Sequence, residues 1–349
     1  MRAAFTFVLL CVLGVLGGSE RVLAQAPAFG LQRSLEMRKA QEPNDGEIHV
    51  LKAQGNVYML LGAGANVAVQ IADEGVLVVD TGTTAMSDKL LAGIRKLSDK
   101  PIRYIVNTHL HPDHTGGNDV IGKAGRTTQG GPTTIISHEN ALARMSAPVG
   151  KPGAAAPALW PTDTYYPEEK DFYFNEEAVM LYHDAAAHTD GDTIVFFRRS
   201  DVVVAGDIFV TTQYPFIDAE SGGSVQGIIA GLNRILDLCV PKHEQEGGTM
   251  VIPGHGKLSD ESEVLEYRDM LVIVKERIED MVKRGMTIDQ VKAAKPTLDY
   301  DLHYGIDNGP WTTSKFIEAV YKDVSKAAKA APAPAKAAPK PAPAAKGKK

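Results

Sequence analysis

Three imidazoles and one carboxylate lie within six residues, directly after a segment that is predicted to be a strand. The strand is expected over residues 102–106, and the cluster follows as His109, His111, Asp113 and His114. With 10 histidines in 349 residues, such an H-x-H-x-D-H string arises by chance at on the order of one starting position in a million. Alternate residues at a strand end project to the same side, so His109 and His111 can hold one ion together. Imidazole with carboxylate is a ligand set that zinc favours where no thiolate is present.

Three further candidate ligands follow predicted strands in the second half of the chain. His188 lies in the turn sequence A-H-T-D-G-D, Asp207 follows the apolar run 202–204, and His255 lies in P-G-H-G after a run at 250–252. The Asp207 carboxylate would be costly to bury without a partner. One such residue would be weak support for a site, but together they supply the donors that two metal half-shells need.

The order of these motifs resembles the metallo-β-lactamase superfamily over roughly residues 48–276. The resemblance implies an α/β fold, a four-layer αββα sandwich with two mixed β-sheets and the metal site at one edge. It also implies two zinc ions per chain. Carried over residue by residue, the ligands of the first zinc would be His109, His111 and His188, those of the second Asp113, His114 and His255, with Asp207 as the bridge. Asp80 matches the family's strand-end aspartate, which implies that it supports the ligands from behind.

Two positions narrow the resemblance within the family. Asp207 stands where the cysteine-bearing β-lactamases have a thiolate, and it is similar instead to the glyoxalase II-like hydrolases. His111 stands where flavodiiron oxidoreductases have a glutamate. The resemblance therefore favours a dinuclear zinc hydrolase of an ester, thioester, lactone or amide-type bond, acting through a metal-bridged hydroxide that Asp113 orients as the catalytic carboxylate. Three alternatives stay open: turnover of β-lactam antibiotics, a mononuclear iron oxidoreductase of the persulfide dioxygenase type, and a non-catalytic zinc-binding envelope protein.

Short β-rich runs separated by glycine and asparagine predict an antiparallel meander near the start of the domain, with strands over 48–53, 57–61, 66–71 and 75–79. Helical spacing over 86–97, followed by the strand at 102–106, predicts a βαβ unit. A second α/β half is expected from strands at 178–182, 193–197, 202–204 and 250–252, with helices over 224–238 and 261–284. Ligands usually lie where the strands of such units end.

The two halves are separated by residues 146–161, which are rich in alanine, proline and glycine. This segment is either a linker or a mobile lid over the metal crevice. As a lid it would bring Trp160, Tyr165 and Tyr166 to the substrate, and His303 with Tyr304 is a further candidate for the pocket rim.

Both ends of the chain are expected to lie outside the catalytic domain. Residues 1–24 have a positive start, a short apolar core and a small-residue end, which predicts a signal peptide and export to the periplasm or medium. Residues 25–47 are expected to be irregular, the hydrolase domain to span 48–325, and the Ala/Pro/Lys segment 326–349 to be disordered. We expect no transmembrane segment in the mature chain.

The charge distribution indicates which classes of partner the protein can bind. The net charge is −6, and because the tail carries +7 and the signal segment +1, the remainder carries −14. A strongly negative domain disfavours nucleic acid, so a small-molecule substrate is expected. The basic tail could make weak contact with an anionic envelope surface.

Overall fold

A computed structural model describes residues 41–330 of the chain. The expected signal peptide and most of the expected tail lie outside the described residues. Within this range no helix is long and apolar enough to cross a bilayer.

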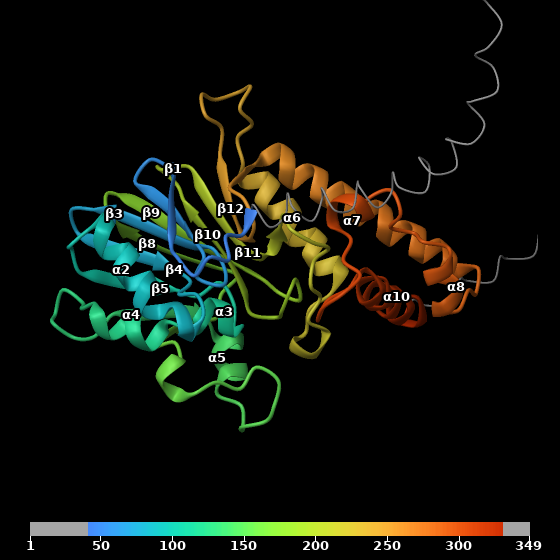
Figure 1. The fold of residues 1–349 in the computed structure, drawn as a ribbon, viewed down its shortest axis with the longest axis horizontal. Coiled ribbons are helices and arrows are strands. Elements are labelled where there is room, and N and C mark those ends of the chain that lie inside the picture. Colours follow the sequence, from blue (N-terminus) through green and yellow to red (C-terminus); the bar gives the residue numbers. More distant parts are fainter. Residues whose placement is uncertain (1–40, 331–349) are drawn as a thin grey trace, which may run out of the picture.

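The first half of the chain builds a seven-stranded sheet whose strands lie in chain order (Figure 1). Its strands are β1 (His49–Gln54), β2 (Val57–Leu61), β3 (Val67–Ala72), β4 (Gly75–Val79), β5 (Ile102–Val106), β6 (Thr134–His138) and β7 (Asp163–Tyr165). The first four strands are antiparallel, which confirms the predicted meander. From β4 to β7 the strands are parallel. Helix α2 (Ser87–Leu97) connects β4 to β5, so the predicted βαβ unit is present.

The second half of the chain builds a six-stranded sheet in the order β13-β12-β11-β10-β9-β8. Its strands are β8 (Glu169–Phe174), β9 (Glu177–Asp184), β10 (Asp192–Phe197), β11 (Val202–Val210), β12 (Met250–His255) and β13 (Ser259–Asp260). All neighbours are antiparallel except β11 and β12, which run parallel. The pairing of β11 with β12 is irregular on both sides of Gly206, and this irregularity lies beside Asp207.

Helices cover the outer face of each sheet. On the first sheet lie α2 and α4 (Asn118–Ala124), whereas the second carries α6 (Val225–Leu238), α7 (Glu261–Lys283) and, farther out, α8 (Ile288–Ala293) and α10 (Thr313–Ala330). The shorter helices are α3 (Pro112–Thr115), α5 (Glu139–Met145), α9 (Asp301–Tyr304) and the 3-10 turns η1 (Thr84–Met86), η2 (Pro157–Leu159) and η3 (Ala219–Ser221).

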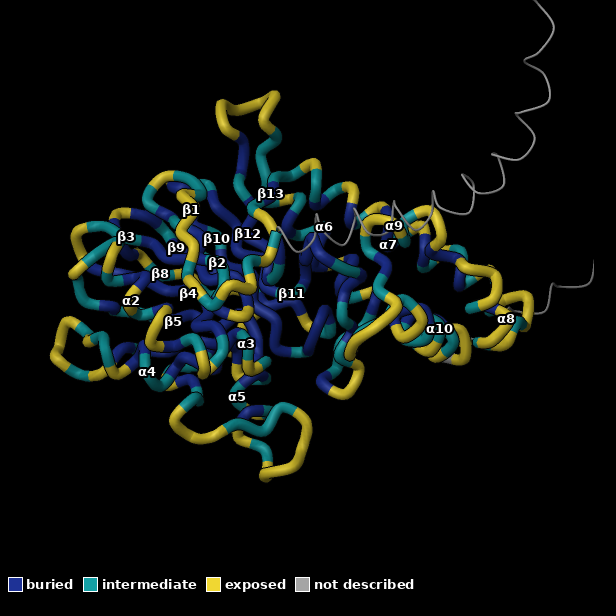
Figure 2. Tube along the Cα trace, in the orientation of Figure 1, coloured by how far each residue is buried: buried dark blue, intermediate teal, exposed yellow. Residues whose placement is uncertain are grey.

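Three apolar clusters fill the spaces between these layers, and Figure 2 shows the buried trace running through both sheets. One cluster lies between the two sheets and includes Val79, Val106 and Ile252. A second joins the first sheet to α2 and α4, and the third joins the second sheet to α6, α7 and α10. Because each sheet buries both of its faces, the strands read as continuous apolar runs. The predicted αββα sandwich of two mixed sheets is confirmed.

Two features differ from the sequence-based expectation. Strands β7 and β8 lie within residues 163–174, where no strand was predicted, because each is at a sheet edge and β8 mixes charged and aromatic residues instead of forming an apolar run. Helix α10 continues to Ala330, past residue 326, where the disordered tail was expected to begin. Alanine and lysine are good helix formers, and the first proline of the tail comes only at Pro332.

Candidate metal centre

The structure brings the seven predicted ligands together at one edge of the two sheets. They form two groups within which the ligand atoms lie no more than 4.8 Å apart: His109, His111, His188 and Asp207, and Asp113, His114 and His255. Each group could hold one metal ion. No group outside this site meets the same criterion among residues 41–330.

The ligands come from strand ends and the loops that follow them. His109 and His111 lie after β5, and Pro112 starts α3, which carries Asp113 and His114. His188 lies in the loop between β9 and β10, and His255 is the last residue of β12. Asp207 lies within β11 rather than after it, because the strand continues beyond the irregular pairing at Gly206. A Cβ at Gly254 would collide with the Asp207 carboxylate, so the glycine gives this side chain its room.

In the first group three ring nitrogens face a common point. Nδ1 of His111 lies 3.1 Å from Nε2 of His109 and 2.9 Å from Nε2 of His188. The Oδ2 atom of Asp207 lies 3.7 Å from the same His188 nitrogen. His109 and His188 are buried, whereas the His111 side chain is 17% exposed, so the group opens to solvent on the His111 side.

The second group is built on the other oxygen of Asp207. Its Oδ1 atom lies 3.2 Å from Nε2 of His114 and 3.6 Å from Nε2 of His255. Nε2 of His255 also lies 3.3 Å from Oδ2 of Asp113, whose side chain is 36% exposed. Asp207 therefore presents one oxygen to each group, which is the geometry of a bridging carboxylate.

The second nitrogen of each ligand histidine is held by a neighbouring group. Distances from ring nitrogen to acceptor oxygen are 3.0 Å for His109 to Thr108 Oγ1, 3.0 Å for His111 to Asp218 Oδ2, 2.7 Å for His188 to Phe216 O, 2.7 Å for His114 to Asp80 Oδ2 and 3.1 Å for His255 to Glu42 Oε1. An N–H that donates outward leaves the inner nitrogen with a lone pair aimed at the centre. This is how proteins orient metal-binding histidines.

Asp80 connects several parts of the site from the end of β4. Its carboxylate accepts from the backbone N–H and the hydroxyl of Thr108, at 2.8 and 2.7 Å, in addition to His114. Its φ of +64° places the backbone in the left-handed region, which aspartate tolerates better than most residues. Asp80 thus holds both Thr108 and the candidate ligand His114 by hydrogen bonds.

Sequence reasoning missed two of the supporting carboxylates. Asp218 lies in the loop between β11 and α6, and Glu42 lies in the N-terminal segment that was expected to be irregular. Neither stands in a motif. In the structure Asp218 caps the N-terminus of the 3-10 turn η3, where its side chain accepts from the backbone N–H of Ser221.

Burial and charge act in opposite directions on the ionisable groups here. Burial lowers the pKa of His188 to about 4 despite the nearby Asp207 carboxylate. Burial would also lower the pKa of His255, but Asp207, Asp113 and Glu42 outweigh it and raise that pKa to about 10. For His114, Asp207 and Asp80 likewise overcome burial and hold the pKa well above its usual value. These carboxylates therefore strongly stabilise positive charge in the second group.

The five residues proposed for a substrate pocket lie in different surroundings. Tyr165 is buried in β7, where its hydroxyl forms a 2.7 Å hydrogen bond with Thr193, so it does not belong to a mobile lid. Tyr166 is 77% exposed. Trp160 packs against a small cluster around Leu110 and donates to the carbonyl of Ala155. Of the other two, Tyr304 contacts Tyr214 and Tyr267 on the helix side of the second sheet, and His303 packs against Tyr304.

The sequence pattern of the family described as the metallo-beta-lactamase superfamily matches residues 61–268, more than half of the chain. The chain belongs to the metallo-beta-lactamase superfamily. The matched range contains all seven candidate ligands and Asp80.

Three relatives within the superfamily are informative. A linear primary-alkylsulfatase of Pseudomonas sp. (strain ATCC 19151) is 57% identical over 47 residues, which cover 13% of this chain and 9% of the relative. The solved structure of a stereoselective inverting sec-alkylsulfatase, Pisa1 from Pseudomonas sp., has a TM-score of 0.59 at 15% identity, covering 87% of this chain and 54% of that one. A metallo-beta-lactamase type 2 of Bacillus sp. (strain 170) is 20% identical over 235 residues, covering 65% of this chain and 83% of the relative. The chain thus spans about half the length of the solved alkylsulfatase it matches, and that likeness concerns the fold.

Proposed function

We propose that this superfamily hydrolase is a dinuclear zinc enzyme that cleaves an ester, thioester, lactone or amide-type bond of a small molecule. The observation that carries the proposal is the position of Asp207, whose two carboxylate oxygens face two separate groups of donors. A mononuclear iron enzyme would need only the first group. The second group would then be three closely spaced polar side chains with no role.

The chemistry of the donor set fits zinc. Nε2 of His114 and Oδ1 of Asp207 are buried and form no hydrogen bond, although they lie 3.2 Å apart. Such atoms are costly inside a protein unless another group satisfies them. Imidazole and carboxylate ligands without a thiolate suit zinc. A cation between these two atoms would be stabilised by the surrounding carboxylates.

The residues of the chain have distinct parts in this proposal. Two zinc ions, when bound, lower the pKa of a coordinated water and polarise the bond to be cleaved. Asp113 is the most exposed of the ligand carboxylates, so its free oxygen can accept a proton from the attacking water. Asp80, Asp218 and Glu42 fix the orientation of three of the ligand rings, as expected of groups behind a metal centre.

A second candidate substrate class is the alkyl sulfate ester. It is favoured by the alkylsulfatase relatives, one by a short segment of high identity and the other by a fold likeness over most of this chain. Turnover of β-lactams is a further candidate, because the metallo-beta-lactamase type 2 relative matches at 20% identity over 65% of this chain.

The test is a substrate panel with the purified protein. The panel would contain p-nitrophenyl acetate, a thioester, a lactone, primary and secondary alkyl sulfates and a chromogenic cephalosporin, each assayed with and without a chelator. Metal-dependent turnover of an acyl substrate supports the first proposal, and turnover of the sulfates alone supports the second. Absence of metal-dependent turnover across the panel would contradict both and favour a binding protein.

We also propose that the protein is exported, on the strength of the pattern in residues 1–24. N-terminal sequencing of protein recovered from the periplasm and from the medium tests this. A mature chain that begins near residue 25 is expected, whereas full-length protein confined to the cytoplasm would contradict it.

A further inference from the structure

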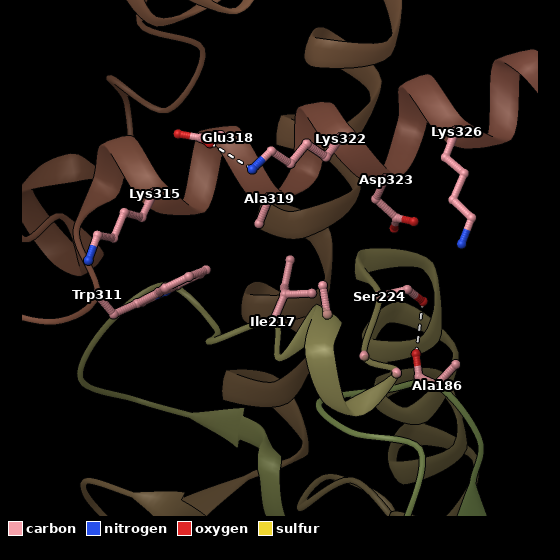
Figure 3. A pocket seen from close by; sticks show the side chains of 13 residues that line it. Ala186, Ile217, Ser224, Trp311, Lys315, Glu318, Ala319, Lys322, Asp323 and Lys326 are labelled. Atoms are coloured by element: carbon pink, nitrogen blue, oxygen red, sulfur yellow. Dashed lines mark hydrogen bonds and ion pairs between the residues drawn. The ribbon is translucent and has the colours of Figure 1, made fainter. Parts of the chain in front are cut away.

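A cavity of about 570 Å³ lies between α10 and the loop that leads from β11 into α6 (Figure 3). Ligand pockets for small molecules typically have volumes of about 300–1,000 Å³. The cavity is separate from the metal centre, because none of the seven candidate ligands lines it. Its floor is apolar and is formed by Trp311, Ile217 and small side chains, among them Ala319 of α10 and Ala186 of the loop between β9 and β10.

The α10 side of the cavity carries a row of lysines on one helix face. Lys315, Ala319, Lys322 and Lys326 follow one another at spacings of four, three and four residues, which places them on the same side of the helix. At the helical rise of 1.5 Å per residue, the row is about 16 Å long. The other face of α10 is anchored in the core by Phe316, Val320 and Val324, which fixes the backbone of the lysine row beside the cavity.

The two acidic groups in the cavity, Glu318 and Asp323, already have partners, and one of these partners is Lys322 of the lysine row itself. Asp323 accepts from the backbone N–H of Val225 at 2.9 Å and thereby occupies the N-terminus of α6. Glu318 lies between Lys322 at 2.8 Å and Lys292 at 3.1 Å. Lys315 donates to the carbonyl of Pro310, and Lys326 forms no ion pair with any residue in the range 41–330. The rim therefore offers positive charge, with Lys315 and Lys326 at its two ends.

We propose that this cavity binds a single-chain amphiphilic anion, with its alkyl chain on the Trp311 and Ile217 floor and its sulfate-like or carboxylate head group against the lysines. Apolar walls with a few charged groups at the edge are typical of sites for such ligands. The basic tail beyond α10 is a poor occupant, because its lysines would meet lysines of the same charge.

The first experiment measures binding of decanesulfonate, well below its micelle-forming concentration, to the full protein by calorimetry and by the fluorescence of Trp311. Trp160→Phe removes the only other tryptophan and makes Trp311 the sole reporter. Decanesulfonate has no ester bond, so binding can be measured whether or not the protein is a hydrolase. We expect saturable binding of about one molecule per chain with a change in Trp311 emission. No saturable binding would overturn the proposal.

Two comparison ligands separate the head group from the chain. Decanol, a neutral molecule with the same chain, is expected to bind at least about tenfold more weakly, because it lacks the charge that the lysines attract. Inorganic sulfate is also expected to bind at least about tenfold more weakly, because it lacks the chain that covers the apolar floor. Equal affinity of either compound would contradict an amphiphile site.

Variants of α10 then locate the binding. The triple variant Lys315→Gln, Lys322→Gln, Lys326→Gln should weaken decanesulfonate binding at least about tenfold, whereas Lys329→Gln, an exposed lysine outside the cavity, should leave it unchanged. Ala319→Met should block the cavity and also weaken binding. Because the three lysines are exposed, the triple variant is expected to fold, and unchanged affinity in it would place the ligand elsewhere.

Discussion

The Nε2 atom of His114 lies 3.2 Å from the Oδ1 atom of Asp207, and both atoms are buried without a hydrogen bond. The other nitrogen of His114 is held by Asp80 at 2.7 Å, so the ring cannot turn away without breaking that bond. The other oxygen of Asp207 faces His188 across 3.7 Å. Two potential metal-ligand atoms that are fixed facing each other in this way form the arrangement expected around a cation.

The first prediction concerns Asp207. Asp207→Ala should weaken the second metal most, because the first group would keep three imidazoles, whereas the second would lose the oxygen shared by His114 and His255. Turnover should fall about 100-fold or more, since the metals lose their common ligand. Metal content and turnover are measured together, with Asp237→Ala on the exposed side of α6 as the control. Asp207→Cys should recover part of the metal content, because thiolate is a good zinc donor. Two retained metals at near-normal turnover in Asp207→Ala would show that Asp207 is not a bridge.

The second prediction concerns Asp218, which holds His111 from outside the centre at 3.0 Å. Asp218→Ala should reduce metal affinity at the first group about 10- to 100-fold, which is the usual effect of losing such a partner. Asp218→Asn should lose less, because its carbonyl oxygen can still accept from His111. Zinc affinity is measured by competition with a chromogenic chelator, and Glu220→Gln, an exposed neighbour in the same turn, is the control. Equal zinc affinity in Asp218→Ala and wild type would show that Asp218 does not support metal binding.

Asp80 is predicted to matter for stability as well as for metal binding. Asp80→Ala leaves three buried donors without an acceptor and places alanine at a φ of +64°, so we expect a loss of about 3–5 kcal/mol in the free energy of unfolding. Asp80→Asn should lose less, because asparagine tolerates this backbone conformation and keeps one acceptor. Urea unfolding provides the measurement. Asp73→Ala, which changes an exposed aspartate near the same strand, should leave the midpoint unchanged, and an equal loss in both variants would contradict this role of Asp80.

The fourth prediction is a pH dependence of stability that arises from His138, which is not one of the candidate metal ligands. His138 stacks on His183 with ring centroids 3.5 Å apart, and burial together with His183 lowers the pKa of His138 to about 4. Between that value and the ordinary pKa of about 6.5, the unfolded chain binds the proton and the folded protein does not. Stability should therefore fall as the pH is lowered from about 6.5 to 4.

The matched variant for this dependence is His138→Asn. Nδ1 of His138 accepts from the backbone N–H of Asn140 at the start of α5, and asparagine is also a good acceptor at a helix start. The difference in melting temperature between pH 7 and pH 5 should be smaller in His138→Asn than in wild type. An identical difference would mean that His138 does not titrate in this window.

The candidate ligands could be picked out from the sequence because they lie in local patterns that rarely arise by chance. His109, His111, Asp113 and His114 lie within six residues, and His188 and His255 lie in glycine-containing turns after apolar runs. Most of the buried strands were predictable for a different reason, since strands covered on both faces consist of continuous apolar runs, whereas β7 and β8 lie at sheet edges and lack such runs.

Two of the supporting residues, Glu42 and Asp218, could not be predicted, because their roles depend on long-range contacts. Glu42 reaches His255 across 213 positions of sequence, and Asp218 reaches His111 across 107. Tyr165 was misjudged because an aromatic residue beside a proline-rich segment suggests a lid, whereas its hydroxyl is fixed by Thr193 on the other sheet. Composition alone does not distinguish these two environments.

The most direct test of the dinuclear site is the metal content of the wild-type protein, purified without added metal and measured alongside its turnover. We predict about two zinc ions per chain, with activity and melting temperature both lowered by a chelator, since a ligand of the folded state stabilises it. One equivalent of tightly bound iron, with no zinc, would contradict the dinuclear zinc centre and the hydrolytic mechanism built on it.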